Sequence, residues 1–491
     1  MTNIFMHNPR LIPRWIPSLF VLFAVLVLTA CQPTGEPPVV SMDSTSLVET
    51  SVELTQPAPE STPTSMTPSA TPAYLVSLTE LNGQKIVFSH PWSGETANLI
   101  DQMVDSFNQS NEWGIHVMVR RAGSSMALAD QVEGDRLDAD YPQVVVAPSE
   151  HLLSWLENSG LVRPLNDLIA DPYFGLTEQQ RADFPLVFWQ QDQAGGSQVG
   201  IPALRDIPVI FYNTTWAAEL GFTEPPATAD DFKTQACAAA FVNGHDRFAA
   251  NDGTGGWIVN TDGLVVYTWL KSFGLKDELA GDPLQFHFDQ LVTQTTFAFA
   301  RSMVDEGCAW FSRTTASNEY FANRQALFYT GNLTDLALQA KTNTRLESQD
   351  SWTILPFPAG DRPVTVAGGL SYGVLRSSEV QEAAAWLFVR WMSLPENSAK
   401  LLVAGGGLPV SAASAELART QMDSNPLWTS TLQWIPTMQS APPVAGWRIA
   451  RFVLQDAFWQ SLQSFVPLED IPSILEQLDA TIVEIQAQQG Q

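Results

Sequence analysis

The stretch IVFSHPWSGETANLIDQMVDSFNQSN, residues 86–111, decides the class of fold. Its first four residues form an apolar run of the length of a buried strand. Residues 95–109 then repeat apolar side chains at helical spacing, with Leu99, Met103 and Phe107 on one face. A buried strand that leads directly into an amphipathic helix is the first half of a βαβ unit.

The next segments repeat this alternation of strands and helices. Residues 115–119 alternate as a strand, and residues 143–146 form another apolar run, which a helix at 151–157 follows. Strands separated by helices lie parallel in one sheet, so we expect an α/β fold. The roughly 410 residues beyond residue 81 exceed one compact core and predict two domains.

The first 31 residues have the pattern of a signal peptide. Two arginines precede a 12-residue apolar run, residues 19–30, which is shorter than the ~20 apolar residues that cross a bilayer. The run ends in LTAC, residues 28–31, which resembles a bacterial lipobox, where cleavage precedes a cysteine that then carries lipid. The alternative is ordinary cleavage beside an incidental Cys31.

Residues 32–81 are expected to form a disordered tether. Between residues 32 and 73 the chain contains 8 prolines and 15 serines or threonines, with no lysine or arginine. Such a segment buries too little apolar surface to offset the entropy of ordering it. We therefore expect lipidated Cys31 to hold the protein at the cell membrane, facing the extracytoplasmic side.

The net charge limits the kinds of partner that the protein can bind. With 52 acidic and 25 basic residues the net charge is −27, which argues against nucleic acid because binding to phosphates relies on Lys and Arg.

Besides Cys31, the chain has two cysteines, Cys237 and Cys308. An oxidising compartment favours a disulfide between them, and two separate buried thiols are the alternative.

Motifs of catalysis are nearly absent from the sequence. The six histidines are scattered, and neither a metal-binding spacing nor a phosphate-binding loop occurs, so we expect no metal and no cofactor. GLSYG, residues 369–373, matches the GxSxG nucleophile motif. However, the last histidine, His287, precedes Ser371, so the hydrolase order Ser–acid–His is impossible, and we interpret Ser371 as a strand residue. A glycoside hydrolase, which needs only two carboxylates, stays an alternative.

Five segments together resemble the extracellular solute-binding proteins of family 1, the sugar-binding lipoproteins of ABC importers. They occur in the family's order: residues 86–111, PQVVVAPSEHLLSWLENSGLVRPL (142–165), VGIPALRDIPVIFYNTTWAAELGFTEPPAT (199–228), WTILPFPAGDRPVTVAGGLSYGVLRSSEVQEAAAWLFVRWMSLPENSA (352–399) and GGGLPVSAAS (405–414). Each motif is weak alone, and their order carries the resemblance.

The resemblance implies a two-lobe periplasmic-binding-protein-like fold of type II, with discontinuous lobes joined by crossover strands. Lobe one would comprise residues 82–204 and 358–400, and lobe two residues 205–357 and 401–491. The implied function is that of a lipid-anchored, monomeric, non-catalytic receptor. It would capture a sugar or oligosaccharide between the lobes and deliver it to the permease subunits of an ABC importer. The alternatives are a secreted glycan-active enzyme and a ligand-sensing receptor for a membrane signalling protein.

Four candidate ligand-binding residues follow the first strand: Trp92, Ser93, Gly94 and Glu95. They lie at the carboxyl end of that strand, where open α/β sheets place ligands. An aromatic plate suits the apolar face of a sugar, and a glycine lets the backbone approach it. Trp92 could instead plug the core or hinge, and Glu95 could merely cap the helix.

The other candidates lie at strand ends, after a glycine-rich loop, or near the expected hinge: Tyr212, Asn213, Trp257, Asn332, Gly369 and Tyr372. Core packing is an equal alternative for Tyr212, as is a helix cap for Asn332. Trp447 and Arg448 could also reach the cleft, with surface packing at least as strong an interpretation.

Overall fold

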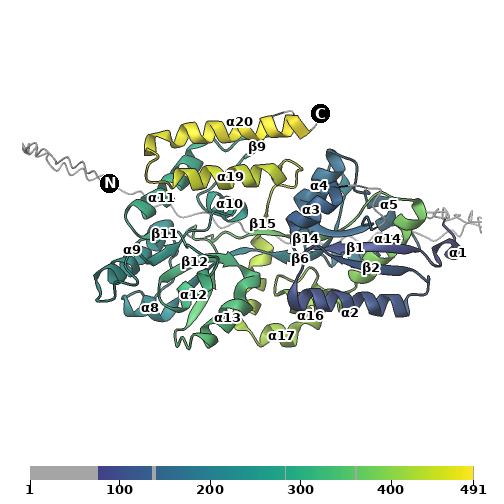
Figure 1. The fold of residues 1–491 in the computed structure, drawn as a ribbon, viewed down its shortest axis with the longest axis horizontal. Helices are drawn as coiled ribbons and strands as arrows, with labels where there is room; N and C mark the ends of the chain where they lie inside the picture. The colour runs from purple at the N-terminus through teal and green to yellow at the C-terminus, as the bar shows by residue number, and fades with distance from the viewer. Residues whose placement is uncertain (1–75, 135–139, 282, 360–361, 490–491) are drawn as a thin grey trace, which may run out of the picture. The chain divides into compact units, whose positions relative to one another are not determined.

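Figure 1 shows a computed structural model of the chain, which describes residues 76–134, 140–281, 283–359 and 362–489. The expected signal peptide, Cys31 and most of the expected tether lie outside the described residues. The tether boundary at residue 81 is corrected, because Leu78–Leu81 forms helix α1 and Leu81 is buried. Within the described chain, no helix is long and apolar enough to cross a bilayer.

The first large sheet has six strands and contains the parallel unit that the sequence predicts. Strand β1 pairs in parallel with both β2 and β3, whereas β14 runs antiparallel to β3 and to β6. The order is β15-β14-β3-β1-β2, with β6 also paired to β14. The strands are β1 (Lys85–His90), β2 (His116–Arg121), β3 (Val144–Pro148), β6 (Ile201–Asp206), β14 (Val366–Val374) and β15 (Gln439–Ser440).

Helix α2 (Gly94–Ser110) covers this sheet with the predicted apolar face. It buries Ile100, Met103 and Phe107 in the same core as Phe88 of β1. Each such side chain contributes about 1.5–3 kcal/mol when fully buried. Further helices that pack on this sheet or on α2 are α3 (Ser125–Glu133), α4 (Ser149–Glu157), α7 (Leu186–Gln190), α14 (Glu379–Met392) and α15 (Pro395–Gly405).

The second large sheet has five strands in the order β11-β8-β12-β7-β13. Strand β7 runs antiparallel to both of its neighbours. The strands are β7 (Pro208–Asn213), β8 (Gly255–Ile258), β11 (Ala309–Trp310), β12 (Ala326–Asn332) and β13 (Trp352–Leu355). Aromatic rings fill the core beside it, with Phe232 in edge contact with both Trp257 and Trp269.

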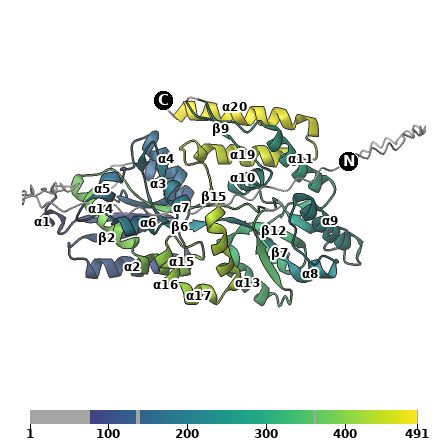
Figure 2. The ribbon, with the colours of Figure 1, turned by 180° about the vertical axis from the view of Figure 1, so that it is seen from behind.

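Long helices flank the second sheet, and α19 and α20 lie side by side in Figures 1 and 2. They are α9 (Ala229–His245), α10 (Gly263–Ser272), α11 (Leu291–Asp305), α19 (Trp447–Ser461) and α20 (Ile471–Gln489). Cys237 of α9 and Cys308 are joined by a disulfide in the structure, with their Cα atoms 4.4 Å apart. Shorter helices are α5 (Asn166–Ala170), α6 (Glu178–Ala182), α8 (Thr214–Glu219), α12 (Ser317–Ala322), α13 (Leu336–Arg345), α16 (Ala412–Leu417), α17 (Arg419–Asp423) and α18 (Pro426–Ser430).

The chain passes between the two sheets through consecutive strands. Strand β6 belongs to the first sheet and β7 to the second, and only Ile207 separates them. Two α/β lobes linked by crossover strands are the architecture that the sequence predicts. The lobe boundaries stay a prediction, since β15, inside the 401–491 segment expected in lobe two, pairs with β14 of the first sheet.

Candidate ligand-binding cavity

A cavity of about 410 Å³ is lined by segments that belong to both sheets. The first sheet contributes the loop after β1 and the N-terminus of α4. The second contributes the segment after β12 and the N-termini of α10 and α19. Further residues come from the crossover strands β6 and β14, from the segment after β15, and from Thr96, Gln191 and Gly405. A volume of this size falls in the range of roughly 300–1,000 Å³ that is usual for small-molecule sites.

Two tryptophans border the cavity, and one of them has an accessible ring. Trp92 is half-buried and packs on His90, with ring centroids 5.6 Å apart. Trp447 is 2% exposed and packs on Tyr267 at 4.9 Å, so it belongs to the hydrophobic core behind the cavity. Trp92 is therefore the tryptophan that can offer a ring face to a ligand.

Glycines let strand β14 approach β6 closely. Gly369 has φ of +133°, and a Cβ there would lie 2.4 Å from the carbonyl oxygen of Leu204. A Cβ on Gly368 would lie 2.7 Å from the side chain of Leu264. A larger residue at position 369 would displace the backbone of β6, whereas one at position 368 would press on the end of the Leu264 side chain.

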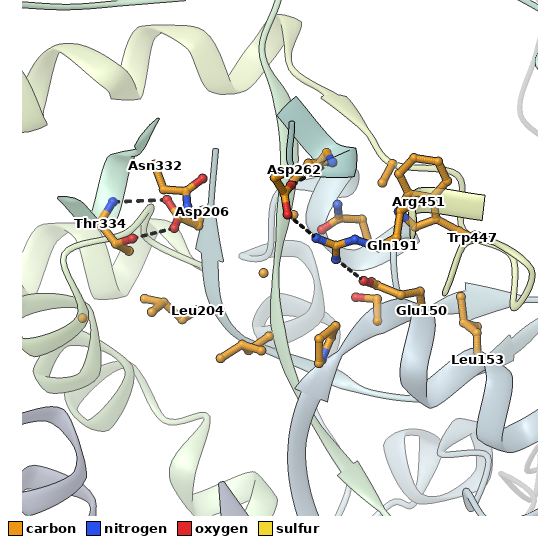
Figure 3. Close-up of a pocket in the computed structure, with 18 of the residues that line it drawn as sticks. Glu150, Leu153, Gln191, Leu204, Asp206, Asp262, Asn332, Thr334, Trp447 and Arg451 are labelled. Atoms are coloured by element: carbon orange, nitrogen blue, oxygen red, sulfur yellow. Dashed lines mark hydrogen bonds and ion pairs between the residues drawn. The ribbon is translucent and has the colours of Figure 1, made fainter. Parts of the chain in front are cut away.

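Asp206 brings a buried carboxyl group to the cavity at the end of β6. One oxygen accepts the N–H of Ile207 at 2.9 Å, and the other accepts the hydroxyl of Thr334 at 2.7 Å (Figure 3). Burial raises the pKa of this carboxyl to about 7, although its hydrogen bonds act in the opposite direction. Near neutral pH this group is therefore partly protonated and can accept or donate a hydrogen bond.

Arg451 of α19 joins the two lobes across the cavity wall. Its Nη1 lies 2.7 Å from Oε1 of Glu150 on α4, and its Nη2 lies 3.2 Å from Oδ2 of Asp262 (Figure 3). Asp262 also caps α10 by accepting the N–H of Leu264 at 2.9 Å. Burial opposes the guanidinium charge, yet the two carboxylates hold the pKa of Arg451 above its usual value.

Gln191 presents a buried acceptor to the cavity. Its Nε2 donates to the carbonyl of Ala367 at 2.5 Å, while its Oε1 has no hydrogen-bond partner among the described residues. A buried oxygen without a partner is costly, and a ligand hydroxyl would satisfy it.

Three of the predicted site residues line this cavity: Trp92, Asn332 and Gly369. They arrive from different elements, because β1, β12 and β14 all end or bend at the same border. Asn332 also precedes a short 3-10 helix (Leu333–Asp335), and its N–H donates to Asp335 at 2.8 Å. The cap role and the cavity position that were weighed for Asn332 thus coexist.

Ser93, Gly94 and Glu95 do not belong to the lining. They are exposed at the beginning of α2, beside Trp92. Gly94 has φ of +59°, which explains a glycine at this turn independently of any ligand.

The structure places the other four predicted residues away from the lining. Tyr212 stacks on Phe328 and donates to Gln235 at 2.8 Å, so core packing, the alternative weighed for it, accounts for its position. Trp257 is fully buried and donates to Thr330 at 3.1 Å.

Asn213 and Tyr372 also make their contacts away from the cavity. Asn213 caps α8 by accepting the N–H of Trp216 at 2.8 Å and donates to Asp350 at 2.7 Å. Tyr372 is 1% exposed in the core under the first sheet. Tyr372 lies on β14, which lines the cavity through residues 368–370, whereas Asn213 ends β7, which contributes no lining residue.

Sequence reasoning missed the charged and amide groups of the cavity: Glu150, Gln191, Asp206, Asp262 and Arg451. A sequence signal for Asp206 exists, because this aspartate separates two strand-like runs in ALRDIPVIFY. No sequence signal exists for Glu150, Asp262 and Arg451, because these residues are separated by more than 100 residues and meet only through packing. Trp447, weighed earlier as a cleft residue, does line the cavity.

A cavity held between two α/β lobes has a counterpart in a known family. Residues 102–427, more than half of the chain, match the family model described as bacterial extracellular solute-binding protein. The chain belongs to this family. The predicted family relationship is confirmed, and the family places this solute-binding protein outside the cytoplasm.

Individual relatives are distant in sequence and close in fold. The sn-glycerol-3-phosphate-binding periplasmic protein UgpB of Salmonella typhimurium is 22% identical over 356 residues, which cover 70% of this chain and 78% of UgpB. The ABC substrate-binding protein Lmo0181 from Listeria monocytogenes, in complex with cycloalternan, aligns with a TM-score of 0.67. That alignment has 16% identity and covers 82% of this chain and 99% of the other.

UgpB from Mycobacterium tuberculosis, in complex with glycerophosphocholine, also aligns with a TM-score of 0.67. The identity is 16%, and the alignment covers 83% of this chain and 100% of the other. These alignments confirm the predicted two-lobe, type II fold.

Proposed function

We propose that this solute-binding protein captures a sugar or oligosaccharide in the cavity and delivers it to the permease of an ABC importer. The observation that carries the proposal is the composition of the cavity. The half-buried ring of Trp92 stands beside hydrogen-bonding side chains that both lobes contribute. The Listeria relative, an ABC substrate-binding protein in complex with cycloalternan, supports the same chemistry.

The arrangement suits a sugar for a physical reason. A pyranose has apolar C–H faces, which pack on Trp92, and a rim of hydroxyl groups that need partners. Asp206, Gln191 and Thr334 offer such partners. Because the groups belong to both lobes, bound ligand stabilises the closed arrangement over an open one.

The proposal includes the way the receptor is held at the membrane. Lipidation of Cys31 would anchor it, and residues 32–77 would let the folded part move near the permease. Two or three acyl chains hold firmly, at about 0.8 kcal/mol for each buried CH₂. The receptor would act as a monomer and catalyse no reaction.

A thermal-shift screen of the purified protein tests the ligand class. The panel contains neutral sugars, oligosaccharides, polyols, amino acids and polyamines. A ligand at a hundred times its Kd stabilises the folded state by about 2.7 kcal/mol, so a micromolar ligand gives a clear rise in Tm at sub-millimolar concentration. A rise confined to sugars is expected. A rise confined to amino acids or polyamines would contradict the sugar assignment.

The ring of Trp92 gives a second test. Trp92→Ala should weaken sugar binding roughly 10- to 100-fold, measured by calorimetry, because it removes the accessible stacking wall. Trp459→Ala is the control, since Trp459 is 50% exposed and outside the cavity. Equal effects of the two changes would argue that the cavity is not the ligand site.

A further inference from the structure

The charges that line the cavity are unequal. Arg451 is the only basic side chain among the described residues of the lining, whereas Glu150, Asp206 and Asp262 bring three carboxyl groups. The lining therefore carries a formal charge of −2 when Asp206 is ionised and −1 when Asp206 is protonated. The whole protein, at −27, adds a field of the same sign.

The positive charge of Arg451 is already balanced by one carboxylate from each lobe. Glu150 reaches Arg451 from the first lobe at 2.7 Å, and Asp262 reaches it from the second lobe at 3.2 Å (Figure 3). Neither carboxylate is free to turn away without loss. Glu150 is held in a largely buried position on α4, and Asp262 also accepts a backbone N–H at the beginning of α10.

An anionic ligand meets a penalty in such a site. A phosphate monoester carries about −1.5 to −2 charges near pH 7. To reach Arg451 it would have to displace one carboxylate or lie beside both, and like charges at contact disfavour binding strongly in a partly dry cavity. A neutral polyol meets no such penalty, because its hydroxyl groups donate to carboxylates and to the unpartnered Oε1 of Gln191.

We propose that Glu150 and Asp262 set the charge specificity of the cavity. By pairing with Arg451 they exclude phosphate esters and leave the site selective for uncharged, hydroxyl-rich solutes. The inference rests on the proposed function in one respect, that the cavity is the ligand site. It separates this chain from the UgpB relatives, which are named for a phosphate ester.

Calorimetry on the full chain tests this specificity with two probes, sn-glycerol 3-phosphate and maltotriose. Wild-type protein should give no measurable heat with the phosphate ester at millimolar concentration. The double variant Glu150→Gln, Asp262→Asn frees Arg451 and should bind sn-glycerol 3-phosphate at least tenfold more tightly than wild type. The double variant no longer has the two carboxylates that repel a phosphate ester, and it keeps the attractive cation of Arg451.

Two further variants make the test specific. Glu157→Gln, Asp252→Asn makes the same change in net charge at exposed positions outside the cavity, and it should not gain phosphate binding. The triple variant that adds Arg451→Gln to the double variant has no cation and no unpaired buried charge. It should lose the gained binding, and Tm measurements on all variants verify that each is folded.

Two outcomes would overturn the specificity proposal. One is tighter binding of sn-glycerol 3-phosphate than of any neutral sugar by the wild-type protein. The other is a folded double variant that gains no binding of the phosphate ester. Failure of the sugar function itself is distinguishable, since it appears as an absence of binding by wild type to every neutral sugar, whatever the variants do with phosphate.

Discussion

Asp206 illustrates how one residue of the cavity wall can link stability to pH. Its carboxyl group is buried at the end of β6, where the negative charge of Asp335 also acts on it, and no cation contacts it among the described residues. Burial of a carboxylate without a cation is expensive, so the group holds its proton to an unusually high pH. The stability of the fold should therefore depend on the protonation of this residue.

The sign of this linkage gives the first prediction. The pKa of Asp206 is about 7 in the folded protein and ~3.9 in an unfolded chain, so between these values the folded state keeps a proton that the unfolded state has released. Stability from this group is thus complete below about pH 4 and is lost as the pH rises to 7. Compared with Asp206→Asn, wild type should lose about 2–3 kcal/mol of unfolding free energy between pH 5 and 8.

Urea denaturation of both proteins at several pH values measures this difference. Asp252→Asn, an exposed aspartate in a loop, is the control and should track wild type across the range. A difference between wild type and Asp206→Asn that stays constant with pH would show that Asp206 is ionised in the folded protein throughout.

At the scale of elements, the buried ion pair between Arg205 and Asp192 connects the crossover strands β6 and β14. Arg205 of β6 is 0% exposed and donates to the carbonyl of Leu370 on β14 at 2.9 Å and to Asp192 at 2.8 Å. Ser371 of β14 donates to the same carboxylate at 2.8 Å, which confirms its interpretation as a strand residue. Ser149, at the first turn of α4, donates to it at 2.6 Å, so three elements that border the cavity share one network.

Loss of this ion pair should lower the free energy of unfolding. Arg205→Met leaves the Asp192 carboxylate buried without its cation, and we expect a loss of about 3–5 kcal/mol of unfolding free energy in urea denaturation. The double variant Asp192→Asn, Arg205→Met removes both charges and should recover at least half of that loss. A single variant within 1 kcal/mol of wild type would show that water or a neighbour compensates Asp192.

The disulfide links helix α9 to the chain that enters β11. The bridge from Cys237 to Cys308 closes a loop with a sequence separation of 71 residues, so it restricts the unfolded chain strongly. We expect its removal to lower the unfolding free energy by about 2–4 kcal/mol. Dithiothreitol should therefore lower the Tm of wild type and leave that of Cys237→Ser, Cys308→Ser unchanged. Modification of Cys237 or Cys308 by iodoacetamide in the folded, unreduced protein, located by peptide mapping, would contradict the pairing.

At the scale of the whole molecule, the proposed membrane anchoring depends on Cys31. Its lipidation would keep a protein of net charge −27 at the membrane surface. Cys31→Ala should abolish labelling by a palmitate analogue and release the protein from the membrane fraction. Retention of the unlabelled variant in that fraction would indicate another anchor.

The sequence predicts the elements well and the cavity only in part. The helix at α2 and the strand at β1 follow from spacing, and the alternation of strands and helices implies the parallel pairing that is found. Trp92 and Gly369 are predictable because strand ends and glycine pairs mark sheet borders. Tyr212 and Trp257 resemble site residues equally well, and their burial depends on partners elsewhere in the chain.

The amino-acid sequence alone determined the periodicity of each helix and strand and their order, because residues close together in the chain set these features. The sequence did not determine the charged wall of the cavity, because Glu150, Asp262 and Arg451 come from three helices on two lobes. Their contact depends on how α19 packs against α4 and α10, which is a property of the tertiary structure. Charge specificity is therefore decided by packing between distant segments, since a charged side chain acts only on what lies within a few ångströms of it.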